Sequence, residues 1–463
     1  MKKILGFVAM VLAIAACNTM EMDNQPTGKD GMITITAQLA PKTALTKALA
    51  FGKDAGDNDI IVSTWEVGEH LAIRYKVNTV NYASDAEITA VDGNGTATIS
   101  FSLSTVPDDG STCTIIYPYG ASTYYKDDGT IETGFFKNQT GLLNAGMDLR
   151  VGNGVIHTSS PATLDVTTQP AAKVDIFKFK IQDISGADTT TTAFKVRDYS
   201  GNLIASVTPG SATGTLYAVL PVLEADTTYW FSATINDKPF IAKAKTKTSV
   251  ATVGGNYYQS TVRMATIRNV IAANGKFYKN AAAATADNTT AVAMITVLYT
   301  SNQDMLNGYH GRALALSDAG SGDVILWRST STTNYDHKKY FSTSHFEDED
   351  GLDYNASHNN DTYPAFKAAI SNNGTATPPG CSAWYLPSGE QWNTMISSFK
   401  GYSSLRDAFA AVGGTEMNTS SYWSCSECTN SLAWNISFSN GTWYTSNKSS
   451  SNNAHYVRSA LAF

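Results

Sequence analysis

Short segments in which apolar and polar residues alternate recur along the first half of the chain. Such segments cover residues 32–39, 65–75, 97–103, 112–118, 174–181, 194–197, 214–221, 229–235 and 250–264. A period of two puts successive side chains on opposite faces of a strand, so each segment predicts a β-strand. Turn-forming residues such as Asp92-Gly93-Asn94-Gly95 separate neighbouring segments. The spacing is typical of β-sandwiches, with a first domain at 31–168 and a second at 169–264.

The pattern changes in the region 270–463, where helical periods join the alternating ones. Apolar runs at 291–299, 311–316, 323–327, 432–438 and 457–463 predict strands, and Asn440-Gly441 predicts a hairpin turn. Ser388 and Gln391 form a capping box before an apolar stripe of helical spacing that ends near Gly401. A second helix is expected from Ser404 to Val412, and a short one near residues 364–370. We therefore expect a C-terminal α+β domain.

Length and composition agree with a mainly β protein of several domains. The chain has 463 residues, of which 43% are hydrophobic and 11% aromatic. This length suggests about three domains. The formal net charge is −7, and no basic stripe interleaved with aromatic residues offsets it. Nucleic acid is therefore not expected as a partner.

The N-terminus carries a targeting signal. Lys2 and Lys3 precede an apolar run, and Leu12-Ala13-Ile14-Ala15-Ala16-Cys17 ends in small residues before a cysteine. The run is too short to span a bilayer permanently. It resembles a bacterial lipobox, which implies a signal peptide over 1–17 and lipidation (palmitate) of Cys17. The alternative is an ordinary secretory signal with an incidental cysteine. Residues 18–30 are polar, and we expect them to form a tether between the lipid and the folded part of the chain.

A family resemblance covers roughly residues 30–262. The lipobox, the first strand, the loop Thr46-Lys47-Ala48 and the motif Trp65-x-x-Gly68-Glu69-x-Leu71-x-Ile73 together resemble the fimbrillin-like (type V pilus) surface proteins of Bacteroidota. The resemblance implies two transthyretin-like β-sandwich domains. It also implies that a trypsin-like protease cuts after a loop Lys or Arg and removes the first strand, opening a groove for a neighbour's strand. Lys47 is the candidate cleavage residue, with Lys42 and Lys53 as secondary candidates.

The physics of that step does not depend on the family. Removing one strand exposes unpaired N–H and C=O groups beside a row of apolar pockets, an edge that another strand can fill. The alternative is that Lys47 is simply an exposed loop lysine.

The acidic segment 347–353 is the candidate cation site. Asp348, Asp350 and Asp353 are oxygen donors of the kind that calcium takes, although the spacing is not that of an EF-hand. Nearby His337, His345 and His358 raise the alternative of a transition metal. A solvated acidic loop is the competing reading, in which case there is no cofactor.

Five of the eight tryptophans lie between residues 381 and 444. Trp384, Trp392 and Trp434 fall on patterned faces and are expected in the core. Trp443 and Tyr444, just past the hairpin tip, are the candidate ligand-binding residues, because exposed aromatic rings stack on sugars or pack on protein partners.

A second resemblance covers roughly residues 270–463. The motifs Cys381-x-x-Trp384-Tyr385-Leu386-Pro387-Ser388, Tyr422-Trp423-Ser424 and Ala433-Trp434, with the terminal Val457-Arg458, resemble the C-type-lectin-like domain of Bacteroidota surface lipoproteins and pilus-tip subunits. The resemblance implies a compact domain that binds carbohydrate or protein. The Glu-Pro-Asn triplet of calcium-dependent lectins is absent, and Trp434-Asn435-Ile436 lacks the Asp of Trp-Asn-Asp.

Four cysteines follow Cys17. Cys113 lies in an apolar strand and is expected as a buried thiol. Cys425 and Cys428 form a lone Cys-x-x-Cys with no second pair at metal spacing. The candidate disulfide joins one of these two to Cys381.

The combined expectation is a fimbrial tip or accessory adhesin on the outer membrane, assembled by strand addition. Its expected partners are other fimbrial subunits, a host or bacterial surface glycan or protein, and outer-membrane lipid. The predicted C-terminal strand is used within its own domain, which favours a tip over a shaft position. The alternative is a non-polymerising surface lipoprotein that captures polysaccharide. We do not expect an enzyme, although the lectin-like fold also occurs in formylglycine-generating enzymes.

Overall fold

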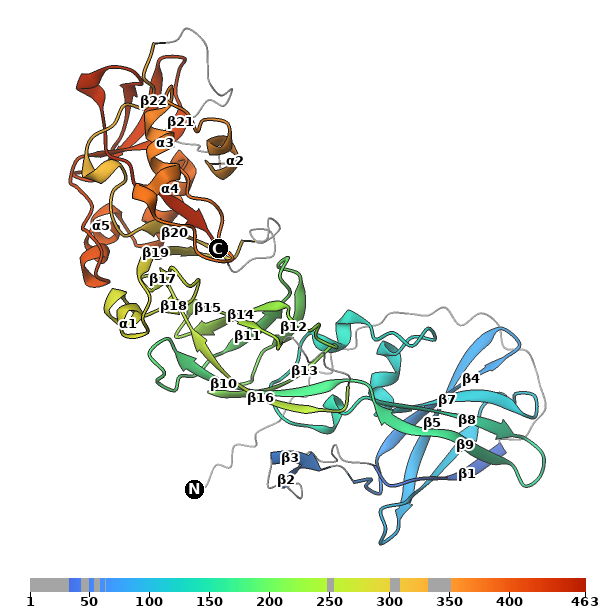
Figure 1. The fold of residues 1–463 in the computed structure, drawn as a ribbon. Coiled ribbons are helices and arrows are strands. Elements are labelled where there is room, and N and C mark those ends of the chain that lie inside the picture. Colours follow the sequence, from blue (N-terminus) through green and yellow to red (C-terminus); the bar gives the residue numbers. More distant parts are fainter. Residues whose placement is uncertain are drawn as a thin grey trace, which may run out of the picture.

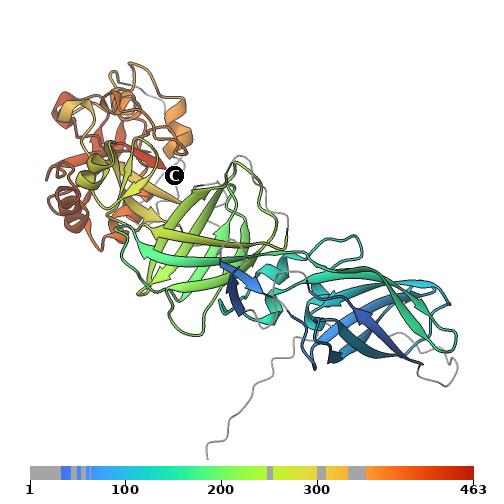
Figure 2. The ribbon, with the colours of Figure 1, turned by 60° about the horizontal axis from the view of Figure 1, so that its bottom comes forward.

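The computed structural model describes residues 33–42, 50–53, 59–62, 64–247, 254–299, 309–331 and 351–463 (Figure 1). Three units follow one another along the chain and in space, so the molecule is elongated, with the second unit between the other two (Figure 2). The structure is mainly β, as the alternating pattern predicts.

The strands of the first unit close into a barrel with the order β1-β6-β5-β4-β7-β8-β9. A continuous ladder thus replaces the two separate sheets expected from the sequence. The strands are β1 (Ile33–Leu39), β4 (His70–Val77), β5 (Val80–Val91), β6 (Ala97–Leu103), β7 (Ser111–Tyr117), β8 (Arg150–His157) and β9 (Thr163–Ala172). A separate hairpin consists of β2 (Ala50–Lys53) and β3 (Asp59–Val62).

Strand β1 is held unequally by its two neighbours. It pairs with β6 along its whole length, from Ile33 opposite Leu103 to Leu39 opposite Ala97. With β9 it forms one parallel pair, Thr36 with Thr163. Its inward side chains Ile35, Ala37 and Leu39 are buried, whereas the residues between them are exposed. The alternation read from the sequence is therefore confirmed, and it fixes which face of β1 enters the barrel.

The second unit is a sandwich of two sheets. One has the order β13-β10-β16 and the other the order β12-β11-β14-β15. The strands are β10 (Asp175–Asp183), β11 (Ala193–Arg197), β12 (Leu203–Val207), β13 (Thr215–Leu220), β14 (Thr228–Ile235), β15 (Lys238–Lys245) and β16 (Tyr257–Met264). Aromatic rings of Phe179, Phe194 and Phe231 contact one another in its core.

The first and second units share one core. Short 3-10 helices between β7 and β8 cover the junction: η1 (Tyr119–Tyr124), η2 (Thr133–Phe136) and η3 (Ala145–Met147). Leu149 and Val151 belong to the same apolar cluster as the sandwich residues. Gln139 adds polar contacts, because its amide donates to Val219 O (3.0 Å) and accepts from Val219 N (2.8 Å). Contacts of this kind favour a fixed relation between the two units.

The second and third units are also joined by packing. The indole of Trp230, on β14, stacks on the imidazole of His310 with ring centroids 4.0 Å apart. Trp230 and Ile241 lie in one buried cluster with Ile271, Leu461 and Phe463 of the third unit. The three units are therefore packed end to end in one elongated molecule (Figures 1 and 2).

The third unit is α+β, as expected. A five-stranded sheet has the order β18-β17-β19-β20-β24, and a three-stranded sheet the order β21-β22-β23. The strands are β17 (Val270–Ala272), β18 (Phe277–Tyr278), β19 (Ala291–Leu298), β20 (Gly311–Ala315), β21 (Ser421–Glu427), β22 (Leu432–Ser437), β23 (Trp443–Asn447) and β24 (Ala460–Ala462). The α-helices are α1 (Ala281–Ala286), α2 (Gly351–Ala356), α3 (Pro364–Ser371), α4 (Gly389–Ser398) and α5 (Tyr402–Ala411). The remaining 3-10 helices are η4 (Gly320–Gly322), η5 (Asn372–Gly374) and η6 (Ser451–Asn453).

Two local predictions are corrected. Helix α4 has the capping box from Ser388 and Gln391, but α5 begins at Tyr402, two residues before the expected start at Ser404. The expected strand at 323–327 reduces to one bridge, Ile325 with His455. Trp327 is instead buried with its Nε1 donating to Ser424 O at 2.9 Å, so the apolar run fills a core without joining a ladder.

Within the described residues, no helix is both long and apolar enough to cross a membrane.

Candidate functional site at the end of the first strand

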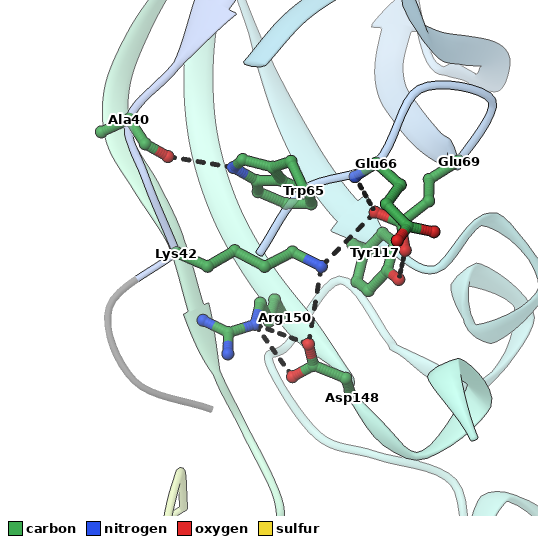
Figure 3. Close-up of polar contacts among 8 residues, drawn as sticks. All are labelled: Ala40, Lys42, Trp65, Glu66, Glu69, Tyr117, Asp148 and Arg150. Atoms are coloured by element: carbon green, nitrogen blue, oxygen red, sulfur yellow. Dashed lines mark hydrogen bonds and ion pairs between the residues drawn. The ribbon is translucent and has the colours of Figure 1, made fainter. Parts of the chain in front are cut away.

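Lys42, three residues after β1 ends, lies with its ammonium inside the first unit (Figure 3). Its side chain is 0% exposed. The Nζ atom is 4.0 Å from the ring centre of Trp65 and 3.8 Å from that of Tyr117. The two rings meet edge to face, with centroids 5.3 Å apart. A cation between two aromatic rings is attracted by the negative charge of the ring faces.

The path of the backbone explains how Lys42 reaches this position. Trp65 Nε1 donates to Ala40 O at 3.0 Å, and Ala40 N donates to Gln169 Oε1 at 3.0 Å. Pro41 restricts the backbone between Ala40 and Lys42. These contacts tie the end of β1 to the loop before β4 and to β9, and they direct the Lys42 side chain inward.

Two carboxylates face the ammonium. Nζ lies 3.6 Å from Glu69 Oε2 and 3.7 Å from Asp148 Oδ2, which are ion-pair distances. Glu69 is held by Tyr117, whose hydroxyl donates to Oε1 at 2.6 Å, and by Glu66 N, which donates to Oε2 at 3.0 Å. Gly68, with φ of +87°, makes the turn that brings Glu69 back toward Glu66.

Arg150 completes the cluster. Its Nε donates to both carboxylate oxygens of Asp148, at 2.8 and 2.9 Å, and both side chains are buried. Lys42 and Arg150 thus balance Glu69 and Asp148 in formal charge. Buried charges that are paired in this way avoid much of the cost that an isolated one would carry.

Burial changes the protonation of the cluster. Burial lowers the pKa of Lys42 from 10.5 to about 8, although the carboxylates of Asp148 and Glu69 oppose the shift. Burial also raises the pKa of Tyr117, and its hydrogen bond to Glu69 adds to this effect. The lysine amine therefore changes charge closer to neutral pH than an ordinary lysine does.

The cluster is suited to holding the end of β1. Its four partners come from the loop before β4, from β7 and from the segment entering β8, so Lys42 links the first strand to distant parts of the barrel. Lys42 is only a secondary cleavage candidate by its sequence, and the structure buries its side chain. The motif around Trp65 and Glu69 was noted in the sequence, but its partnership with Lys42 depends on contacts between remote segments.

The candidate ligand-binding residues Trp443 and Tyr444 separate onto opposite faces of β23. Trp443 packs against the apolar core, and its Nε1 donates to Asn393 Oδ1 at 3.1 Å. Tyr444 is 45% exposed, and Asn440 Nδ2 donates to its hydroxyl at 3.1 Å. Of the pair, Tyr444 is the one that offers a face to solvent. Trp384, Trp392 and Trp434 are buried, as expected.

The structure has no disulfide bond between Cys381 and either of its two candidate partners, Cys425 and Cys428. Cys381, Cys425 and Cys428 all carry thiols, as does buried Cys113. Cys381 packs near Trp384, Cys425 lies in the cluster of Trp327 and Trp423, and Cys428 packs against Trp434. The expected bond across these clusters is therefore not present in this structure.

Other candidate residues lie outside the described residues. These are Cys17, the cleavage candidate Lys47, and Asp348 and Asp350 of the candidate calcium site. Asp353 falls within helix α2, which begins at Gly351. Among the described residues, no group of three or more His, Cys, Asp or Glu side chains is arranged to hold a metal ion.

No family model matches the chain, and no curated protein matches its sequence. Among solved structures, it is similar to a fimbrial protein from Bacteroides ovatus ATCC 8483, with 14% identity, coverage of 92% of this chain and 100% of that chain, and a TM-score of 0.32. It is also similar to a candidate cell adhesion protein from Bacteroides fragilis NCTC 9343, with 13% identity, 50% and 92% coverage and a TM-score of 0.30. A candidate cell adhesion protein from Bacteroides uniformis ATCC 8492 has 12% identity, 52% and 94% coverage and a TM-score of 0.27. Similarity at this level does not show a function for this chain.

Proposed function

We propose that the protein is a cell-surface fimbrial subunit, at the tip or as an accessory adhesin. In this proposal it is anchored through lipidated Cys17 or released from the outer membrane by cleavage at Lys47. Its first strand is then replaced by a strand of another subunit, and its third unit, a C-type-lectin-like domain, binds a glycan or a protein.

The observation that carries the proposal is the unequal pairing of β1. Full pairing with β6 and a single pair with β9 place β1 at the weakly paired seam of the barrel, so its departure breaks one full ladder. A groove of about 680 Å³ already separates the start of β1 from the segment Thr158–Thr163, and Ile33 and Thr36 line its other side. Loss of β1 would leave free edges on β6 and β9 beside the apolar positions of Ile35, Ala37 and Leu39.

The Lys42 cluster supports a controlled release. In the sequence, Lys42 lies between β1 and Lys47, so a cut after Lys47 would leave Lys42 attached to the outgoing strand. The severed strand would then remain bound through its apolar face and through the cluster until another strand displaces it. A buried Lys42 side chain cannot enter a protease specificity pocket, which favours Lys47 over Lys42 as the cleavage residue.

The third unit supports a position at the end of an array. Strand β24 pairs with β20, and Phe463 is buried in the cluster shared with the second unit. This segment is therefore engaged within its own sheet and is not available as a donor strand. Tyr444 on the exposed side of β23 is the candidate contact for a glycan or protein ligand.

Strand exchange can be measured directly. The purified chain is treated with a trypsin-like protease and then incubated with a fluorescent peptide that has the sequence of residues 33–42. We expect the cleaved chain to incorporate the peptide, and neither the uncleaved chain nor a Lys47→Gln variant to do so. A peptide with aspartate at the positions of Ile35, Ala37 and Leu39 is the matched control. Cleavage at Lys47 without any incorporation would refute exchange.

The exposed ring of Tyr444 supports one alternative, a non-polymerising lipoprotein that captures polysaccharide. Under this alternative, the mature protein in cells retains lipidated Cys17 and an intact Lys47, and it binds on a glycan array. A mature N-terminus at Ala48 in fimbriae would instead favour the fimbrial proposal.

A further inference from the structure

The second unit has a groove between two edge strands that the proposed exchange of β1 does not use. Strand β15 is the edge of one sheet and β16 the edge of the other. They meet at one antiparallel bridge, where Ile241 N donates to Ala265 O at 2.8 Å and Ala265 N donates to Ile241 O at 2.7 Å. Beyond this bridge, the described residues of the two strands form no further pair, and a groove of about 560 Å³ opens between them.

The backbone groups facing this groove follow from the bridge. Alternate residues of a strand point their N–H and C=O groups to the same side. The backbone N–H and C=O groups of Ile241 and Ala265 point toward each other. Lys243 is two residues from Ile241, and Arg263 and Thr261 are two and four residues from Ala265. The backbone groups of these three residues therefore point into the groove. The two edges run antiparallel, so an inserted strand would be antiparallel to one and parallel to the other.

The side chains give the groove an apolar floor. Phe231, Ala242 and Val262 are buried there and belong to the core of the sandwich. An extended strand places alternate side chains on opposite faces, so one set would lie on this floor and the other would face solvent.

The rim of the groove is positively charged. Lys180, Lys243 and Arg263 line it, and none of its described lining residues is Asp or Glu. Lys180 is partly neutralised by Asp188, whose Oδ2 lies 2.9 Å from its Nζ. Lys243 lies over the rings of Trp230 and Phe277, at 5.4 and 5.2 Å from their centres, and it has no ion pair with a described carboxylate. A ligand that complements this rim would carry negative charge.

We propose that this groove binds an extended acidic segment of a partner protein, which adds as a strand between β15 and β16. Backbone hydrogen bonds from both edges would hold the segment, apolar residues would contact the floor, and carboxylates would pair with the rim. The site lies in the second unit and requires no cleavage at Lys47, so its failure and the failure of the exchange of β1 are distinguishable.

The test uses the uncleaved chain and two fluorescent peptides. The acidic probe is Thr-Glu-Val-Asp-Val-Glu-Thr with blocked ends, and the basic probe has lysine at each acidic position. Binding is followed by fluorescence anisotropy at low and high salt. We expect the acidic probe to bind, and its affinity to fall as the salt concentration rises. The basic probe should bind at least about tenfold more weakly.

Two variants locate the binding. Arg263→Glu reverses a charge on the rim and should lower the affinity for the acidic probe by about tenfold or more. Thr261→Pro removes an N–H that faces the groove, and proline is tolerated on an edge strand, so binding should fall while Tm stays close to that of the parent. Lys238→Glu, on the other edge strand β15 and outside the groove, is the matched charge control, and Thr261→Ala keeps the N–H.

Specific outcomes would overturn the proposal. The proposal is wrong if both probes bind equally or if the acidic probe does not bind. It is also wrong if Arg263→Glu and Lys238→Glu lose the same affinity for the acidic probe. Self-association of the chain without peptide, abolished by Arg263→Glu, would assign the groove to a second copy instead. If Thr261→Pro does not fold, the comparison of Arg263→Glu with Lys238→Glu still decides the question.

Discussion

The Nζ atom of Lys42 lies 3.6 Å from Oε2 of Glu69, which links the segment after the first strand to the turn before the fourth. The twenty-six intervening residues include Lys47 and the β2–β3 hairpin. The two ends of that insertion are therefore joined by charge inside the barrel. A cut within it would leave the contact in place.

The first prediction concerns pH. The pKa of Lys42 in the folded chain is about 8, below its ordinary 10.5, so between these values the unfolded chain binds more protons at this residue. Stability should therefore rise as pH increases from about 8 to 10.5, by at most roughly 3 kcal/mol from this group. The measurement is urea unfolding of the parent and of Lys42→Met at pH 7.5, 9 and 10.5. The difference in free energy of unfolding between the two proteins isolates Lys42, because the contributions of other titrating groups cancel.

Lys76→Met is the matched control for this measurement. Lys76 has a side chain 59% exposed, so its removal should leave the pH dependence of unfolding unchanged. A parent and a Lys42→Met variant with parallel pH profiles would show that Lys42 is not buried as a charge.

The second prediction concerns proteolysis. Folded chain treated briefly with trypsin should resist cleavage after Lys42, because its side chain is buried between Trp65 and Tyr117. We expect the earliest cut near β1 to follow Lys47, and urea-unfolded chain to be cut after both residues. Mass spectrometry of the fragments gives the answer. An early cut after Lys42 in folded chain would mean that the cluster does not hold it.

The third prediction concerns the apolar face of β1. Leu39 is fully buried, so Leu39→Ala should lower the free energy of unfolding of the first unit by about 2–5 kcal/mol. After cleavage at Lys47, the same variant should exchange β1 for the peptide faster than the parent. Gln38→Ala, at an exposed neighbouring position, should change neither quantity, and equal effects of the two substitutions would contradict the register.

The fourth prediction separates Trp443 from Tyr444. Trp443→Ala removes packing and the bond to Asn393, so it should lower stability by about 2 kcal/mol. Tyr444→Ala should leave Tm nearly unchanged and reduce binding of any ligand found on a glycan array or by adhesion assay. Tyr444→Phe, which keeps the ring, should retain binding that depends on stacking. Ligand binding that survives Tyr444→Ala would place the site elsewhere.

Local patterns predicted much of the secondary structure. The strand at 97–103 and the capped helix after Ser388 were confirmed, because side-chain alternation and capping depend on residues close in sequence. The prediction of a strand at 323–327 was wrong, because the burial of a residue depends on contacts with parts of the chain far away in sequence. An apolar run can be buried by contacts from elsewhere, and Trp327 packs against Phe366 of α3 with ring centroids 4.9 Å apart.

The site itself was only partly accessible from the sequence. The motif of Trp65 and Glu69 and the exposed position of Tyr444 could be read from order and spacing, whereas the burial of Lys42 could not. Its neighbours Tyr117 and Asp148 are far along the chain, and only the closing of the barrel brings them to the ammonium.

The sequence by itself determined a mainly β chain with an α+β C-terminal part, because periodicity is a local property of the backbone. The tertiary structure decided that the first sheet closes into a barrel, that β1 is held mainly by β6, and that two sheet edges part to form a basic groove. These features depend on pairings between residues far apart in sequence, and hydrophobic patterns do not specify which edges meet.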